Sequence, residues 1–275
     1  MTIKQLVDDG LFLADAGRFV GALTTLLAAV SGSSRKVFPK DVAMSRSSPG
    51  KKMGDREAFT LFLGGRLNRV MCLLRDVPEE GASAITFWFA GKQQHIEDVL
   101  YEQFRCSLSH NGVLPAKVDF KESGGFDRND RSYQIFIDPD FVCLQRGWIN
   151  LLVEVVVQAR CNAAEFGLKH HELRPKAGVD ASAVFQRLKD EFGVSQGRAN
   201  TMRWLVEFVG PEAVLIATAE QLTASLKKAI ALRLIPAGPT GFASRGLATD
   251  DGLFTQKGLE VARVIADAYD LVDVT

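Results

Sequence analysis

Arg105 and His110 are the residues whose types and spacing point most clearly to chemistry. They lie five positions apart in "FRCSLSHNG", residues 104–112. Histidine titrates near neutral pH, so His110 can give or take a proton. Arginine stays charged and presents a planar fork of N–H donors that fits phosphate oxygens. The pair therefore suits cleavage of an RNA phosphodiester without a metal, with His110 moving protons and Arg105 stabilising charge.

The spacing of this pair limits how it can act. Five residues turn an α-helix by about 500°, which leaves the two side chains about 140° apart. Convergence on one phosphate therefore needs long side chains, a distorted helix end or a second copy of the motif. A different interpretation also fits the residues, in which His110 is only a helix-end histidine and Arg105 a surface arginine.

Polar side chains near this pair are candidates for substrate binding. Serine and asparagine can hydrogen-bond to a phosphate, and a glutamate one turn before Arg105 can hold its guanidinium. A plain structural role is the alternative for each of them. The candidates are Glu102, Ser107, Ser109 and Asn111.

Composition is that of an ordinary globular protein without a dominant charge. The chain has 275 residues, of which 47% are apolar and 24% charged, so it can bury a sizeable core. Lys and Arg total 33, as do Asp and Glu, and the net charge is therefore about zero. Such a protein has no global field for nucleic acid, so any polyanion site must be a local patch.

Neither a metal nor a membrane is expected. The four cysteines include no CxxC pair, which argues against structural zinc. His170 and His171 precede Glu172, but adjacent histidines point apart on regular structure. We therefore expect no metal and no cofactor. Acidic residues near the N-terminus are unlike a signal peptide, and no apolar run is long enough to cross a bilayer. These features predict a soluble, cytoplasmic protein.

Hydrophobic periodicity predicts a mainly α chain with a small β-hairpin. Asp55 is the expected N-cap of the third helix, and Asn111-Gly112 is the expected end of the fourth. Residues 32–54 are expected to form a basic loop, and a domain boundary is expected near residues 168–180. The expected helices span residues 3–16, 18–31, 56–74, 93–109 and 139–166, and the hairpin strands are 113–120 and 131–138.

The order of these elements resembles the HEPN superfamily (higher eukaryotes and prokaryotes nucleotide-binding). Its signature is an arginine, four to six residues and a histidine near a helix end, which Arg105 and His110 match within "LYEQFRCSLSHNG". "DREAFTLFLGGRL" is also similar to the third helix of such proteins. The resemblance covers residues 1–170 as a helical bundle with the β-hairpin inserted. Cys106 departs from many active members, which carry a polar residue at that position.

This resemblance implies a function and a set of partners. Two protomers would pack as a homodimer across the helix of Arg105 and His110, so that both motifs line one cleft. The implied activity is metal-independent endoribonuclease cleavage that leaves a 2′,3′-cyclic phosphate. Such proteins often serve as toxins or anti-phage effectors, with an antitoxin or defence partner. The alternative is a non-catalytic HEPN-like module that binds a nucleotide, RNA or a protein, which Cys106 and the neutral charge favour.

Residues 180–275 form the expected second domain, smaller and helical. "GLATDDGLFTQKGLEVARVI" is similar to the wing and last helix of winged-helix domains. Lys227, Lys228 and Arg233 lie on the preceding expected helix, where a nucleic-acid reader places cations. A helical dimerisation or capping module fits these residues equally well.

Overall fold

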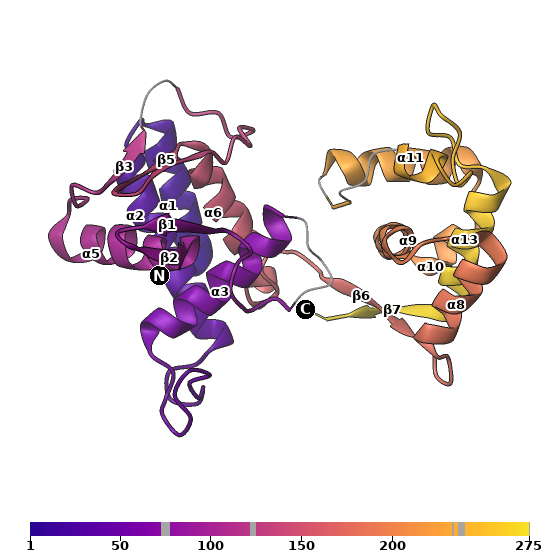
Figure 1. Cartoon of the computed structure of the whole chain (residues 1–275), viewed down its shortest axis with the longest axis horizontal. Helices are drawn as coiled ribbons and strands as arrows, with labels where there is room; N and C mark the ends of the chain where they lie inside the picture. Colours follow the sequence, from indigo (N-terminus) through magenta and orange to yellow (C-terminus); the bar gives the residue numbers. More distant parts are fainter. Residues whose placement is uncertain (73–77, 122–124, 233, 236–239, 275) are drawn as a thin grey trace. The chain divides into compact units, whose positions relative to one another are not determined.

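A computed structural model gives a mainly α protein, as the periodicity predicts (Figure 1). It describes residues 1–72, 78–121, 125–232, 234–235 and 240–274. The chain divides into two compact units, Met1–Leu168 and Lys169–Thr275. Within the described residues, no helix has both the length and the apolar character needed to cross a membrane.

Helix α2 is the centre of the N-terminal unit. It packs against α1, α3 and α6, and these helices lie side by side (Figure 1). Large side chains such as Trp148, Phe59 and Phe104 are fully buried around it, each stabilising the fold by about 1.5–3 kcal/mol. The helical elements of this unit are α1 Ile3–Asp15, α2 Phe19–Val37, α3 Asp55–Val70, α4 Ile96–Val99, the π-helix η1 Leu100–Cys106, α5 Ser107–Asn111, α6 Gly147–Val157, the short 3-10 turn η2 Arg160–Asn162 and α7 Ala163–Phe166.

Helix α2 is longer than its sequence indicates. The expectation of a loop from residue 32 is wrong for its first six residues, because α2 continues to Val37. Serines are favoured in loops, but here the Ser33 hydroxyl donates to the carbonyl oxygen of Ala29 at 2.8 Å and is buried. The extension carries Arg35 to the end of the helix, where it meets α3.

Asp55 is the first residue of α3, so its expected role as the N-cap is wrong. Gly54 holds the N-cap position, and no side chain caps this helix. The Asp55 carboxylate instead accepts a hydrogen bond from Nε of Arg35 at 2.9 Å. Asp55 therefore joins the start of α3 to the end of α2 and does not cap its own helix.

Gly64 and Gly65 mark a close approach of backbone to α3. A Cβ atom on Gly65 would lie 2.1 Å from the carbonyl oxygen of Glu79, and one on Gly64 would lie 2.4 Å from that of Gly81. The pair is costly in a helix interior, but only glycine lets residues 79–83 cross so closely.

A hairpin of β1 (Thr86–Phe89) and β2 (Lys92–His95) precedes the fourth expected helix. Its two-residue turn uses Ala90 and Gly91, with φ of 50° and 77°. Positive φ at both positions is the turn geometry that matches strand twist. The expected helical start at residue 93 is therefore wrong, and the helix begins at Ile96.

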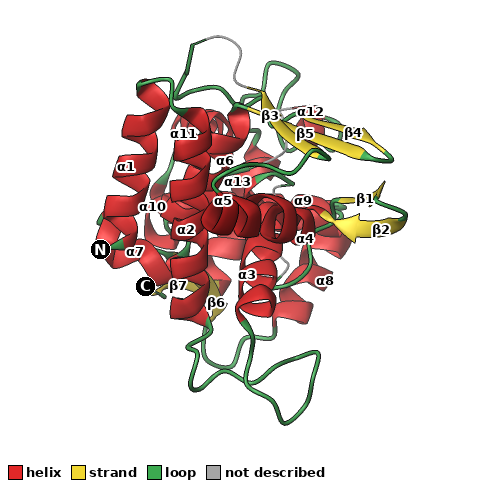
Figure 2. Ribbon diagram, turned by 90° about the vertical axis from the view of Figure 1, so that its left-hand side faces the viewer, coloured by secondary structure: helices red, strands yellow, loops and turns green. Residues whose placement is uncertain are grey.

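The second small sheet has the strand order β3-β5-β4, built from Val118–Lys121 (β3), Ile135–Asp138 (β4) and Phe141–Gln145 (β5). β4 pairs antiparallel with β5, whereas β3 runs parallel to β5. Figure 2 shows both small sheets on one side of the helices of this unit. The expected hairpin of the segments that contain β3 and β4 is therefore wrong. The expected helix over residues 139–166 is wrong at its start, where Pro139 and Asp140 form the β4–β5 turn and residues 141–145 form β5, but α6 Gly147–Val157 lies within it.

The C-terminal unit has its own apolar core, in which Met202, Leu205 and Val261 are fully buried. Strand β6 (His171–Pro175) pairs antiparallel with β7 (Tyr269–Asp273). Ahead of the last helix, Ala248 and Phe254 form an isolated antiparallel bridge. The helices are α8 Ala181–Phe192, α9 Gln196–Val209, α10 Pro211–Ile216, α11 Ala219–Ala231, α12 Thr240–Ala243 and α13 Gln256–Ala268.

Candidate active site

Arg105 and His110 lie on one continuous helical segment, residues 96–111, which we call the motif rod. Its middle part is the π-helix η1. Arg105 is in η1 and His110 is in the following turn, α5. Gly112 has a φ of 70°, in the left-handed region, so the predicted helix end at Asn111-Gly112 is confirmed. π-Helical turns occur frequently at functional sites.

The two side chains flank the solvent face of this rod. Phe104 is fully buried and marks the side that faces the core. On a helical wheel, Arg105 lies about 100° to one side of Phe104 and His110 about 120° to the other. Cys106 and Ser109 lie on the wheel between them. Arg105 is half-buried, whereas His110 is exposed. The side chains of Arg105 and His110 therefore face solvent in different directions.

Arg105 is held by an aromatic ring rather than by a carboxylate. The guanidinium carbon of Arg105 lies 5.3 Å from the ring centroid of Tyr101. Its Nη1 lies 3.9 Å from the sulfur of Cys106, a weak hydrogen bond. Among the residues that the structure describes, Arg105 forms no salt bridge. Most of its N–H donors therefore remain available to an anion.

Glu102 does not hold Arg105. Its carboxylate forms an ion pair with Arg56 at 2.8 Å, and Arg56 also binds Asp98 at 3.0 Å. The pairing proposed for Glu102 from the sequence is therefore wrong, because α3 supplies a closer cation than the next turn of its own helix. Glu102 stabilises the contact between α3 and the motif rod.

The other predicted neighbours lie close to His110 in the sequence and on α5. Ser109 and Asn111 are exposed, and Ser107 is half-buried. Within the described part of the chain, none of these three side chains, nor His110, makes a hydrogen bond to another residue. The helix end thus presents an imidazole, a hydroxyl and an amide to solvent.

A pocket of about 210 Å³ opens beside Arg105, between α2, α3 and η1. Arg35 and Asp55 were not among the predicted site residues, because Arg35 falls in a segment that reads as a loop. Nothing in the sequence indicates that Arg35 and Asp55, which are 20 positions apart, lie together in the fold. The pocket is lined by Ser31, Gly32, Ser34, Arg35, Asp55, Tyr101 and Arg105.

Positive charge surrounds the Asp55 carboxylate in this pocket. The hydrogen bond from Arg35 holds the pKa of Asp55 below its usual value, against the opposing effect of partial burial. The charges of Arg35, Lys40 and Arg105 lower the same pKa further. Asp55 is therefore ionised at neutral pH, and three cations act on one carboxylate.

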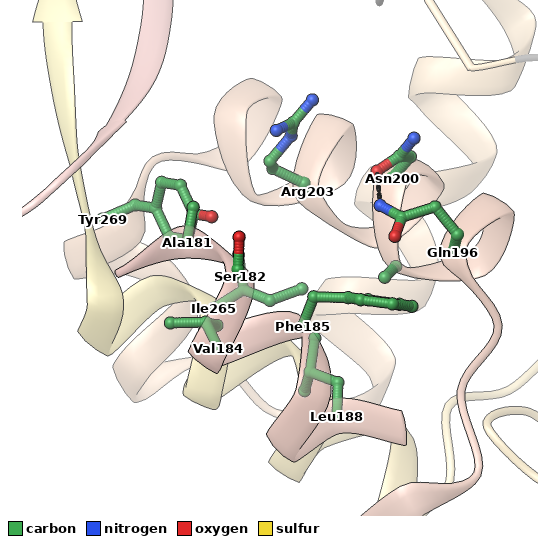
Figure 3. Close-up of a pocket in the computed structure, with 11 residues that line it drawn as sticks. Ala181, Ser182, Val184, Phe185, Leu188, Gln196, Asn200, Arg203, Ile265 and Tyr269 are labelled. Carbon is green, nitrogen blue, oxygen red and sulfur yellow. Dashed lines mark hydrogen bonds between the residues drawn. The ribbon is translucent and has the colours of Figure 1, made fainter. Parts of the chain in front are cut away.

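A second cavity, of about 250 Å³, lies within the C-terminal unit (Figure 3). Val184, Phe185 and Leu188 give it an apolar side. Gln196 donates a hydrogen bond to Asn200 at 3.0 Å beside it. Lys227 and Lys228 are exposed on α11, and Arg233 lies outside the described residues. The full lining is Ala181, Ser182, Val184, Phe185, Leu188, Gln196, Ala199, Asn200, Arg203, Ile265 and Tyr269.

Metal-ligating side chains do not gather in the part of the chain that the structure describes. No group of three or more His, Cys, Asp or Glu residues is placed to hold an ion there. The four cysteines are free, and burial raises the pKa of Cys161 to about 11.

The comparisons with known proteins match one family. No curated protein and no solved structure matches the chain. The model of the Rv1289 family matches residues 2–178, which is more than half of the chain and includes Arg105, His110 and the pocket beside them. The chain belongs to the Rv1289 family.

Proposed function

We propose that this protein is a metal-independent endoribonuclease of the HEPN type. The observation that carries the proposal is the availability of both motif side chains. Among the described residues, the half-buried Arg105 has no carboxylate partner and the exposed His110 has no hydrogen bond. A guanidinium and an imidazole left available on one short segment are the groups that phosphodiester cleavage requires.

The chemistry divides between the two side chains. His110 takes the 2′-hydroxyl proton of the RNA, and the 2′-oxygen attacks the adjacent phosphorus. The bond from phosphorus to the 5′-oxygen breaks, the protonated imidazole gives its proton to that oxygen, and a 2′,3′-cyclic phosphate remains. Arg105 binds the phosphate oxygens, on which charge increases in the transition state. Ser109 lies between the two on the helical wheel and can donate a further hydrogen bond.

A homodimer supplies the geometry that one helix lacks. Arg105 and His110 point about 140° apart on the rod, so one chain aims them at different places. Pairing two rods about a twofold axis brings Arg105 of one protomer toward His110 of its partner. An isologous contact of this kind is the commonest way in which identical chains associate. A restraining partner protein, such as an antitoxin, would keep such an activity in check.

Cleavage of single-stranded RNA in EDTA tests this proposal. The wild-type protein is expected to cut. Arg105→Ala should reduce the rate by about 10²–10³-fold, because a donor to the developing charge is lost. His110→Ala should reduce it by about 10²–10⁴-fold, because proton transfer is lost. Equal cleavage by wild type and both variants would show that other residues do the chemistry.

Matched controls come from the C-terminal unit. Arg187 is an exposed arginine paired with Glu191, and His171 is an exposed histidine. Arg187→Ala and His171→Ala change the same residue types without touching the motif rod, so both should cut at the wild-type rate. Salt-dependent RNA binding without any cleavage would instead support the binding-module alternative.

A further inference from the structure

We propose that the pocket between α2, α3 and η1 binds a phosphate group of the RNA, and that the Asp55 carboxylate occupies this site until RNA arrives. The proposal rests on the proposed function and extends it with two residues, Arg35 as a phosphate ligand and Asp55 as a removable occupant. The pocket lies beside Arg105, so its phosphate is at or next to the one that is cleaved.

Arg35 is fixed in position before any ligand binds. Its Nη1 donates to the carbonyl oxygens of Phe38 at 3.1 Å and Met53 at 3.3 Å. Only 22% of its side chain is exposed. Its remaining fork points at Asp55, with Nε 2.9 Å from the carboxylate. A guanidinium that is already ordered loses little freedom when it binds a phosphate.

Asp55 is the more easily displaced partner. Its side chain is 59% exposed, although it sits on the Arg35 fork. A carboxylate and a phosphate present similar pairs of oxygens to a guanidinium. Because more than half of the Asp55 side chain is exposed, the carboxylate can turn into water, and the phosphate then takes over the Arg35 guanidinium that it leaves. The carboxylate therefore occupies the position that a phosphate oxygen would take.

The charges of the pocket favour a strong anion over this single carboxylate. Arg35, Lys40 and Arg105 all act on Asp55, which leaves two positive charges unbalanced within that group. The pocket also lies at the first residue of α3, a helix of 16 residues without a side-chain cap. The free N–H groups of that turn add partial positive charge.

A nucleic-acid phosphate is the ligand class that these features fit best. The site is shallowly buried and cationic, and the ring of Tyr101 lines it beside Arg105. Guanidinium groups bind phosphate oxygens, and the Tyr101 ring, which contacts both Arg105 and the Phe59 ring, keeps the Arg105 guanidinium in place. Exposed Lys51 and Lys52 lie on the loop before α3 and line a surface hollow that also includes Gly54, the residue before Asp55.

Binding of a non-cleavable oligonucleotide tests the site without relying on catalysis. The probe is a fluorescent single-stranded RNA in which every 2′-hydroxyl is methylated, titrated at low and moderate salt. Asp55→Asn should tighten binding about fivefold, because the competing carboxylate loses its charge. Arg35→Gln should weaken binding about tenfold and reduce the salt dependence, because a phosphate contact is lost.

Asp140→Asn is the matched control for Asp55→Asn. Asp140 is an exposed carboxylate of the same unit, paired with Lys117 at 3.3 Å. Its replacement by asparagine changes the net charge of the protein by the same amount as Asp55→Asn. No change in binding for Asp55→Asn, or an equal change for Asp140→Asn, overturns the proposal. In the unmodified protein, the Nε–H resonance of Arg35 should shift on addition of the probe, and an unmoved resonance also overturns it.

The same experiment separates this inference from the proposed function. Cleavage of ordinary RNA with no effect of Asp55→Asn on probe binding overturns the phosphate site alone. Binding changes as predicted, without any cleavage of ordinary RNA, support the phosphate site and overturn the nuclease.

Discussion

Replacing Gly65 by alanine should destabilise the N-terminal unit, although alanine is the better helix former. The new Cβ would lie 2.1 Å from the carbonyl oxygen and 2.5 Å from the carbonyl carbon of Glu79, and 2.7 Å from Cα of Glu80. All three atoms are backbone, so no side-chain rotation can relieve the overlap. The segment must move away from α3.

The expected change in the free energy of unfolding combines one stabilising effect and two destabilising ones. Alanine returns about 1 kcal/mol of helix propensity. Overpacking costs about 1–3 kcal/mol. A shift of Glu79 also separates its carboxylate from Arg66, which lies 3.6 Å away with only 5% of its side chain exposed. Removing the partner of a buried charge adds a further penalty. We expect a net loss of about 2–3 kcal/mol in the free energy of unfolding.

Urea denaturation followed by tryptophan fluorescence measures this loss. A Trp204→Phe background leaves Trp88 and Trp148, both in the N-terminal unit, as reporters. Gly21→Ala in α2 is the control, because its Cβ would meet only Leu13 side-chain atoms at 3.6 Å, an ordinary contact. That variant should be neutral or slightly more stable. If Gly65→Ala were as stable as Gly21→Ala, the close crossing described here would be refuted.

Three further predictions concern the dimer and the polar interior. Mixed and refolded Arg105→Ala and His110→Ala chains should recover RNA cleavage that neither has alone, and no recovery would mean that each site uses one chain. Burial raises the pKa of Glu97 despite hydrogen bonds from Ser83, so its favourable contribution is complete below the ordinary value of 4.5 and is lost as pH rises through the folded pKa. The free energy of unfolding of Glu97→Gln minus that of wild type, measured by urea titration, should therefore increase from pH 4 to pH 7. A difference that stays constant over this range would refute this. Asn162 donates to the Ser33 hydroxyl at 2.8 Å and the Val156 carbonyl oxygen at 2.9 Å, so Asn162→Ala should cost about 2–3 kcal/mol in thermal unfolding; an unchanged melting temperature would contradict it.

Periodicity in the sequence was sufficient for the helices that bury one continuous stripe. Leu23, Leu26, Leu27 and Val30 of α2 are all buried as their spacing predicts. The end of α2 was missed because two serines and a glycine resemble a loop. The hydroxyls of both serines donate to carbonyl oxygens of the preceding helical turn, a pairing that is seen only in the folded helix.

Strand pairing was harder to predict because it depends on contacts between segments. The segments that contain β3 and β4 alternate as strands should, and both exist. Each pairs with β5 instead of with the other. Residues 141–145 read equally well as the start of an apolar helix, and short apolar runs do not distinguish the two.

The candidate site was predictable in its motif but not in its surroundings. Arg105, His110 and the helix end at Gly112 could be found from residue types alone. The π-helical turn has no sequence signature of its own, and Arg35 and Asp55 meet Arg105 through the packing of α2, α3 and η1. The wrong partner for Glu102 has the same cause, because Arg56 comes from another helix.

Product analysis tests the central claim most directly. Purified wild-type protein and the His110→Ala variant are incubated in EDTA with a single-stranded RNA and with its all-2′-deoxy counterpart, and the product ends are identified by mass spectrometry. The account predicts RNA fragments ending in a 2′,3′-cyclic phosphate, intact DNA and a loss of at least about 100-fold for His110→Ala. Cleavage of the DNA, or undiminished RNA cleavage by the variant, would contradict it.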